Sequence, residues 1–152
     1  MNKNLNYKPL DELSAHILEL LQLDARLSIT EIGRRVGLSA PAVAERIKRM
    51  EDEEIITGYR AIIDNDKIGL TVNAFITLKS NMLHAAAAKK ISEIPEVTEC
   101  YNITGHNCVI MKVATPTTKR LEAIIGQLQA LGETNTSIIL SPTFENRIIK
   151  RN

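Results

Sequence analysis

Hydrophobic positions follow a helical period in the first third of the chain and an alternating period in much of the rest. The most informative stretch, ITEIGRRVGLSAPAVAERIKRME, covers residues 29–51. Its apolar residues form two stripes with spacings of three and four: Ile29, Ile32 and Val36, then Val43, Ile47 and Met50. Such stripes are typical of helices with one buried face. Gly37 lies between them, where the chain must leave the first helix. The pattern predicts two short helices joined by a tight turn.

The starts of both helices carry capping residues. Thr30 is expected to cap the first helix and Ser39 the second, because the early N–H groups of a helix have no partner inside it. Pro41 falls in the first turn of the second helix, where a missing N–H costs little. A further helix is predicted from Asp11 to about Asp24, with a helical apolar face. Together these segments predict a three-helix unit.

The exposed face of the helix after Ser39 combines small residues with arginines. Ala40, Pro41 and Ala42 come first, and Arg46 and Arg49 follow. Between residues 26 and 50 six basic residues stand against two acidic ones. A smooth helix start and a local positive field suit insertion into the DNA major groove. The segment therefore predicts a helix-turn-helix. The alternative is an ordinary helical hairpin with a solvated charged face.

After the acidic run EDEE, two short apolar runs flank Gly58 and predict a small ribbon or wing. The turn-like stretch DNDKIG then suggests a domain boundary. We place a DNA-binding domain at residues 1–64 and a second domain at residues 65–152.

The second domain alternates strand and helix periods. Strands are expected at 71–79, 97–104, 108–114 and 137–144, and helices at 83–94 and 116–132. The order βαββαβ predicts a ferredoxin-like domain, so the fold class is α+β: a winged-type helix-turn-helix followed by a ferredoxin-like domain. Two helices would leave one sheet face bare. Apolar strand residues, Ile76, Ile103, Ile110 and Ile139, suggest that pairing with a second sheet covers it.

Net charge, cysteine spacing and the motifs present limit the classes of function that the sequence fits. Net charge is only +1, which argues against an unspecific DNA coater. The two cysteines, Cys100 and Cys108, form no CxxC pair or zinc spacing, and we expect reduced thiols in the cytoplasm, no metal and no membrane span. No phosphate-binding glycine loop, nucleophile triad or paired carboxylates stand out, so we expect neither an enzyme nor a resident cofactor.

The chain resembles the leucine-responsive regulator/AsnC (Lrp/AsnC) family over nearly its whole length. The matching stretches are ILELLQLDARLSITEIGRRVGLS, ERIKRMEDEEII and YNITGHN. The resemblance implies a transcription factor that binds promoter DNA as a homodimer and often builds octamers. Residues expected at the DNA are Thr30, Arg34, Arg35, Ser39, Pro41, Ala42, Glu45, Arg46, Lys48 and Arg49. Arg46 is the main candidate to recognise a guanine edge.

The resemblance also implies a small-molecule effector, such as an amino acid, bound near one loop. That loop contains Thr104, Gly105, His106, Asn107 and Cys108. Many family members carry an aspartate where this chain has Cys108, and a thiol offers no equivalent charge to a ligand ammonium group. Sensing of a free α-amino acid is therefore in question.

Two alternatives stay open from the sequence. One is an architectural protein that wraps DNA without an effector. The other is an enzyme similar to sirohaem decarboxylases, which resemble this family in architecture and use histidines. His84 and His106 are the histidines of the second domain, and neither has a partner at motif spacing.

Overall fold

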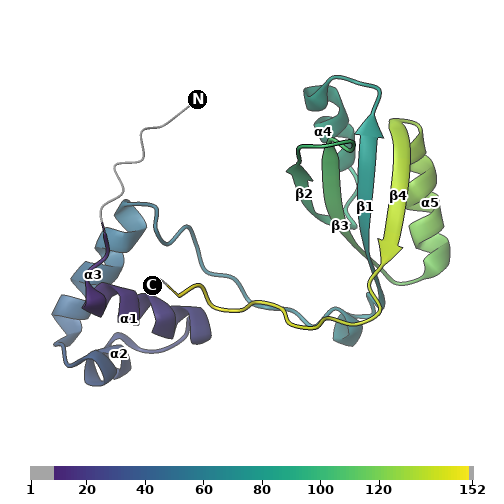
Figure 1. The fold of residues 1–152 in the computed structure, drawn as a ribbon. Helices are drawn as coiled ribbons and strands as arrows, with labels where there is room; N and C mark the ends of the chain where they lie inside the picture. Colours follow the sequence, from purple (N-terminus) through teal and green to yellow (C-terminus); the bar gives the residue numbers. More distant parts are fainter. Residues whose placement is uncertain (1–8, 151–152) are drawn as a thin grey trace. The chain divides into compact units, whose positions relative to one another are not determined.

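The computed structural model describes residues 9–150, apart from the side chain of His84. The chain divides into two compact units (Figure 1). One contains the described residues up to Ala61 together with those from Phe144 onward, and the other spans Ile62–Thr143. The division lies near the boundary expected at residue 64. The last residues, however, cluster with the first unit, whereas the sequence placed them in the second domain.

Three helices make up most of the first unit: α1 (Glu12–Leu23), α2 (Ile29–Val36) and α3 (Ala40–Asp52). Their apolar stripes meet in one core of Ile17, Leu20, Leu21, Ile32, Val36, Val43 and Met50. Ile47, also predicted on this stripe, packs partly buried against that core. The predicted three-helix unit is confirmed.

The helix ends follow local chemistry, with one correction. Asp11 caps α1 and Ser39 caps α3, as predicted. Gly37 ends α2 in the left-handed conformation, with φ of 72°. Thr30, however, lies inside α2, and its predicted capping role is wrong. The cap is Ser28, whose hydroxyl accepts a hydrogen bond from the Glu31 N–H at 3.1 Å.

The second unit contains β1 (Val72–Ser80), α4 (His84–Ser92), β2 (Val97–Asn102), β3 (Val109–Thr115), α5 (Thr118–Gln129) and β4 (Gly132–Ile138), preceded by the short 3₁₀ helix η1 (Asp66–Ile68). The four strands form one antiparallel sheet in the order β2-β3-β1-β4. This order and the alternation with two helices confirm the ferredoxin-like prediction.

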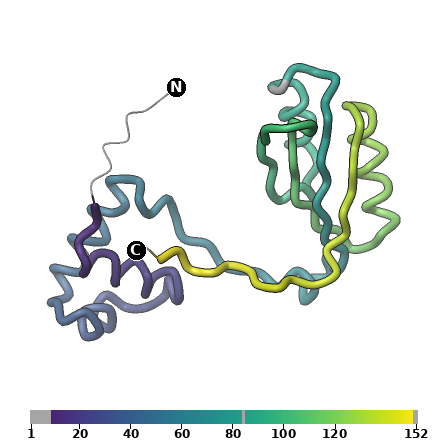
Figure 2. The backbone as a smooth tube through the Cα atoms, viewed as in Figure 1, coloured from purple at the N-terminus to yellow at the C-terminus, as the bar shows by residue number. Residues whose placement is uncertain are grey.

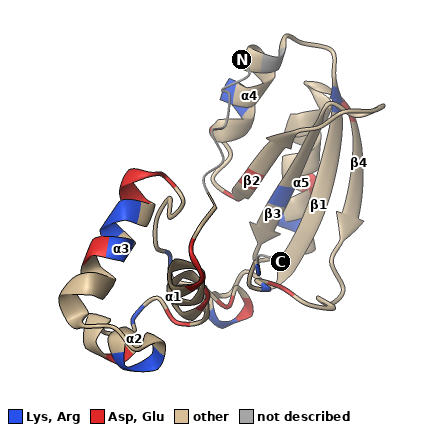
Figure 3. Cartoon of the chain, turned by 60° about the vertical axis from the view of Figure 1, so that its left-hand side comes forward, with Lys and Arg blue, Asp and Glu red and all other residues tan. Residues whose placement is uncertain are grey.

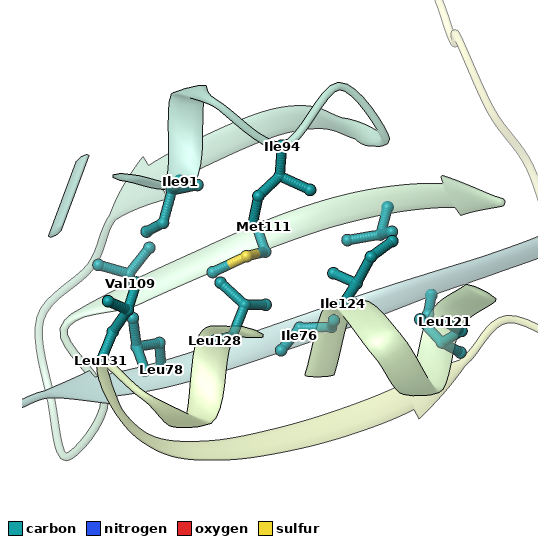
Figure 4. Packing of buried hydrophobic residues seen from close by; sticks show 12 residues of the cluster. Ile76, Leu78, Ile91, Ile94, Val109, Met111, Leu121, Ile124, Leu128 and Leu131 are labelled. Atoms are coloured by element: carbon teal, nitrogen blue, oxygen red, sulfur yellow. The ribbon is translucent and has the colours of Figure 1, made fainter. Parts of the chain in front are cut away.

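The core of this unit lies between one face of the sheet and the helices α4 and α5 (Figure 4). Alternate residues of β1 and β3 point into it, as the period of a half-buried strand requires. The fully buried members include Ile76, Leu78, Met111, Val113, Ile124 and Leu128. Ile76 thus belongs to the helix-covered core. It does not lie on the open face, where we expected it to be covered by a second sheet.

Two other expectations are wrong. The last strand covers Gly132–Ile138, not residues 137–144, because pairing with β1 recruits the polar sequence GETNTSI. The ribbon expected around Gly58 is also absent: the described residues between Asp52 and Val72 contain only η1 and irregular backbone. Ile62 and Ile63 of this segment are exposed, so their apolar side chains are not buried by a paired strand.

The last described residues are hydrogen-bonded to α1 within the first unit (Figure 2). The Gln22 carboxamide donates to the Ile149 carbonyl at 3.0 Å and accepts from the Ile149 N–H at 2.8 Å. Lys150 and Glu19 form an ion pair at 3.9 Å beside it. Among the described residues, no helix is long and apolar enough to cross a membrane.

Candidate nucleic-acid interface and effector loop

The exposed side of α3 carries most of the residues predicted to face DNA. Ser39 and Pro41 are exposed at its start, and Ala42 is half-buried beside them. Glu45, Lys48 and Arg49 are exposed further along. Figure 3 shows that basic and acidic residues both occur along this helix. The Ser39 hydroxyl accepts from the Ala42 N–H at 3.4 Å, which leaves its other hydrogen-bonding capacity available at the helix N-terminus.

Arg46 is less available than the sequence suggested. Its Nη1 donates to both carboxylate oxygens of Asp11, at 2.8 and 2.6 Å, and to the Ser14 hydroxyl at 2.9 Å. Its side chain is only 26% exposed. The guanidinium therefore joins α3 to the start of α1 in the free protein.

Arg49 contacts the same pair more loosely. Its Nη2 lies 3.4 Å from Asp11 Oδ2 and 3.3 Å from Ser14 Oγ, and its side chain is 46% exposed. The backbone N–H of Ser14 and the Arg46 guanidinium lower the pKa of Asp11 from 3.8 to about 2. At neutral pH the carboxylate is fully charged and holds both arginines.

The basic residues at the end of α2 are also paired. Glu31 accepts from Arg34 Nε and Nη2 at 2.9 and 2.8 Å, and from Arg35 Nε at 2.7 Å. These bonds lower the pKa of Glu31 to about 2, the Arg34 bond contributing most. Both arginines remain exposed, so they can still approach a phosphate, but from orientations fixed by Glu31. Thr30 is exposed on the same helix.

The turn between α2 and α3 depends on Gly33, whose role the sequence pattern did not reveal. A Cβ on Gly33 would lie 2.5 Å from the Leu38 carbonyl oxygen. The Leu38 N–H donates to the Gly33 carbonyl at 2.9 Å. The glycine thus permits the close backbone approach that sets the angle between the two helices.

The predicted effector loop joins β2 to β3. It is closed by a hydrogen bond from the Ile103 N–H to the Cys108 carbonyl at 3.0 Å. Thr104, Gly105 and His106 are exposed, and Asn107 is half-buried. The structure thus brings the five predicted residues together at one end of the sheet.

Cys108 has a structural role at this position. Its thiol donates to the Leu78 carbonyl at 3.3 Å and accepts from the Ser80 N–H at 3.2 Å, both at the end of β1. It is half-buried and turned toward β1. A thiol can both donate and accept, which suits a site that contains a carbonyl and an N–H.

Some of these functional roles had a signal in the sequence. Ser28 and Glu31 stand three apart, which is the spacing of a capping box, and Glu31 precedes Arg34 and Arg35 by three and four residues. The pairing of Asp11 with Arg46 had no such signal, because 35 residues separate them.

Comparisons with known proteins agree with this architecture. Residues 10–51 match the AsnC-type helix-turn-helix domain, and residues 71–149 match the Lrp/AsnC ligand binding domain. The chain is 38% identical to the uncharacterized HTH-type transcriptional regulator YezC of Bacillus subtilis, covering 87% of this chain and 94% of the relative. It is 31% identical to a proline dehydrogenase transcriptional activator of Rhizobium radiobacter, covering 91% and 94%.

Solved structures show the same fold. B. subtilis LrpC aligns with a TM-score of 0.86 at 30% identity, covering 90% of this chain and 99% of LrpC. Escherichia coli AsnC aligns with a TM-score of 0.85 at 29% identity, covering 95% and 100%. The matched families and relatives are transcriptional regulators and not enzymes, which sets aside the decarboxylase alternative. The chain is therefore a member of the Lrp/AsnC family, a DNA-binding helix-turn-helix transcriptional regulator with a ligand-binding domain.

Proposed function

We propose that this regulator acts in the cytoplasm as a homodimer, formed through the open face of its sheet, that binds two half-sites on promoter DNA. The observation that carries the proposal is the mixed composition of that face. Phe75 on β1 is 42% exposed and Tyr101 on β2 is 56% exposed. Tyr101 lies directly opposite Ile110 of β3, and Phe75 lies diagonally across from the same Ile110. Aromatic residues of this kind are enriched in protein interfaces.

Charges on the same face suit contact between two identical surfaces. Register places opposite charges across from each other at two positions: Glu99 with Lys112, and Lys79 with Glu133. A two-fold axis brings the same patch of both copies together, so a patch that carries both signs of charge can complement itself. The face is more polar than the sequence suggested, yet its aromatic residues, Phe75 and Tyr101, remain exposed in the single chain.

A dimer places two copies of α3 on one side of the DNA, with half-sites about 34 Å apart or a multiple of that distance. Further assembly to an octamer would multiply these contacts. Arg49 and Lys48 would supply contacts from α3, Ser39 would contact a phosphate, and Arg34 and Arg35 would contact the backbone from α2.

The proposed effector binds near the loop of Thr104 to Cys108. Support comes from the match of residues 71–149 to a ligand-binding domain and from the exposed His106 in that loop. Because the Cys108 thiol faces β1 and bonds to the Leu78 carbonyl, this position offers no carboxylate to an ammonium group. The effector proposed here therefore does not depend on a carboxylate at position 108 for recognition.

The dimer is tested by sedimentation of Phe75→Glu against Ala123→Glu. Both variants add one negative charge to the second unit, but Ala123 is exposed on α5, away from the open face. Wild type and Ala123→Glu should sediment at about 34 kDa, twice 16.9 kDa, or as a multiple of this dimer. Phe75→Glu should sediment as a monomer. A Phe75→Glu protein that remains dimeric would contradict the proposed interface.

A further inference from the structure

Beside the apolar core, α3 is joined to the start of α1 by a polar cluster of one carboxylate, one hydroxyl and two guanidinium groups. Arg46 and Arg49, one turn apart on α3, both reach Asp11 and Ser14. The Ser14 side chain is fully buried, and its hydroxyl accepts from both arginines. The two arginines of α3 therefore share a single anchor at the start of another helix.

The two arginines are held unequally. Arg46 makes three contacts between 2.6 and 2.9 Å and is 26% exposed, whereas the contacts of Arg49 are 3.3 and 3.4 Å and it is 46% exposed. Recognition of a guanine by arginine requires the planar fork to face the O6 and N7 atoms of the base. Arg46 would have to leave the Asp11 carboxylate to present that fork fully. Arg49 would break only two long contacts, at 3.3 and 3.4 Å.

We infer that Asp11 is a positioning residue for DNA recognition: by fixing Arg46 against α1 it sets how α3 is presented, and it leaves Arg49 as the arginine of α3 that reaches DNA. This inference rests on DNA binding by the helix-turn-helix. It reassigns Arg46, which the sequence had suggested as the residue that contacts a base.

The consequence of losing the anchor follows from electrostatics. Without the carboxylate, both guanidinium groups can turn toward any phosphate, and each new phosphate contact releases a counterion. Binding to unrelated DNA should strengthen. Binding to the specific site should gain less or weaken, because α3 is no longer held in one orientation. The ratio of the two dissociation constants should therefore fall.

Asp11→Asn is the appropriate variant. Asparagine caps a helix about as well as aspartate, so the hydrogen bond from the Ser14 N–H is retained while the charge is removed. Glu12→Gln is the matched control. Glu12 is the exposed neighbour, it undergoes the same change of charge, and the structure gives it no ion pair within residues 9–150.

The full chain is titrated with its own promoter fragment and with unrelated DNA across a salt series. Asp11→Asn should lower the ratio of the unspecific to the specific dissociation constant by about tenfold, the loss expected for one misplaced base contact. For unrelated DNA, the slope of the logarithm of its binding constant against the logarithm of the salt concentration should be more negative by about 1 for each arginine released. Glu12→Gln should match wild type within about twofold in both readouts.

The opposite assignment predicts a different result. If Arg46 itself contacts a guanine, Asp11→Asn frees it and the specificity ratio stays unchanged or rises. That result, or a salt slope equal to that of Glu12→Gln, would overturn the inference. Should Asp11→Asn lose its helical circular dichroism, Ser14→Ala takes its place, since it keeps the carboxylate and removes the shared hydroxyl. It should lower the ratio about threefold, and an unchanged ratio would equally overturn the inference.

Discussion

At the scale of single residues, Asp11 and Glu31 orient arginines on the candidate DNA-binding surface. Asp11 contacts Arg46 and Arg49 from another helix, whereas Glu31 contacts Arg34 and Arg35 within α2. Exposed ion pairs add little stability on their own. Their effect here is geometric, since they fix which way each guanidinium points before DNA arrives. A surface with fixed donors loses less side-chain entropy on binding than one with free arginines.

These carboxylates also predict a pH dependence of stability. Folding lowers the pKa of Asp11 from 3.8 and that of Glu31 from 4.5, each to about 2. The unfolded chain therefore binds protons first, and stability present above pH 4.5 is lost as the pH falls toward 2.

The double variant Asp11→Asn, Glu31→Gln should lose less stability as the pH falls through this window. The slope of its free energy of unfolding against pH should be smaller than that of wild type, by an amount equivalent to up to about two bound protons. Urea unfolding at pH 5, 4 and 3, followed by circular dichroism, measures this slope. Glu12→Gln serves as the control. Equal slopes in wild type and the double variant would show that the pairs add no proton linkage.

At the scale of elements, two helical glycines give opposite predictions. A Cβ on Gly33 would meet the Leu38 carbonyl, whereas nothing lies within 4 Å of a Cβ on Gly126 in α5. Gly33→Ala should lower the free energy of unfolding by about 2 kcal/mol through this overlap. Gly126→Ala should raise it by up to about 1 kcal/mol through helix propensity. Urea denaturation of both variants measures these changes, and a stabilised Gly33→Ala would contradict the tight turn.

Most helices and strands could be predicted from the sequence, because the signals that define them are local. Helix periods and caps are local, so the three helices and most of the sheet were predictable. Ser28 and Thr30 both belong to residue types that cap helices, so residue type alone did not distinguish the true cap, Ser28, from Thr30. The strand β4 was misplaced because GETNTSI lacks an apolar alternation, and its pairing with β1 creates the strand. The Asp11 anchor depends on tertiary structure and could not be predicted from spacing.

At the scale of the whole molecule, the chain runs between its units twice. It leaves the first unit after α3, and it returns after β4 to place its last described residues on α1. Within this tail the Arg147 guanidinium stacks on the Phe144 ring at 4.3 Å. The first unit is therefore completed by residues that follow β4 in the sequence.

We expect the helix-turn-helix to give this regulator sequence-selective DNA binding. The most direct test is binding of the purified chain to its own promoter region, titrated with salt and unrelated competitor DNA. We predict a protected footprint repeating about every 10 base pairs and a preference of at least about 10³ over competitor. Equally tight, steeply salt-dependent binding to both DNAs would indicate an architectural protein instead, and no binding at low salt would contradict the assignment of α3 to DNA.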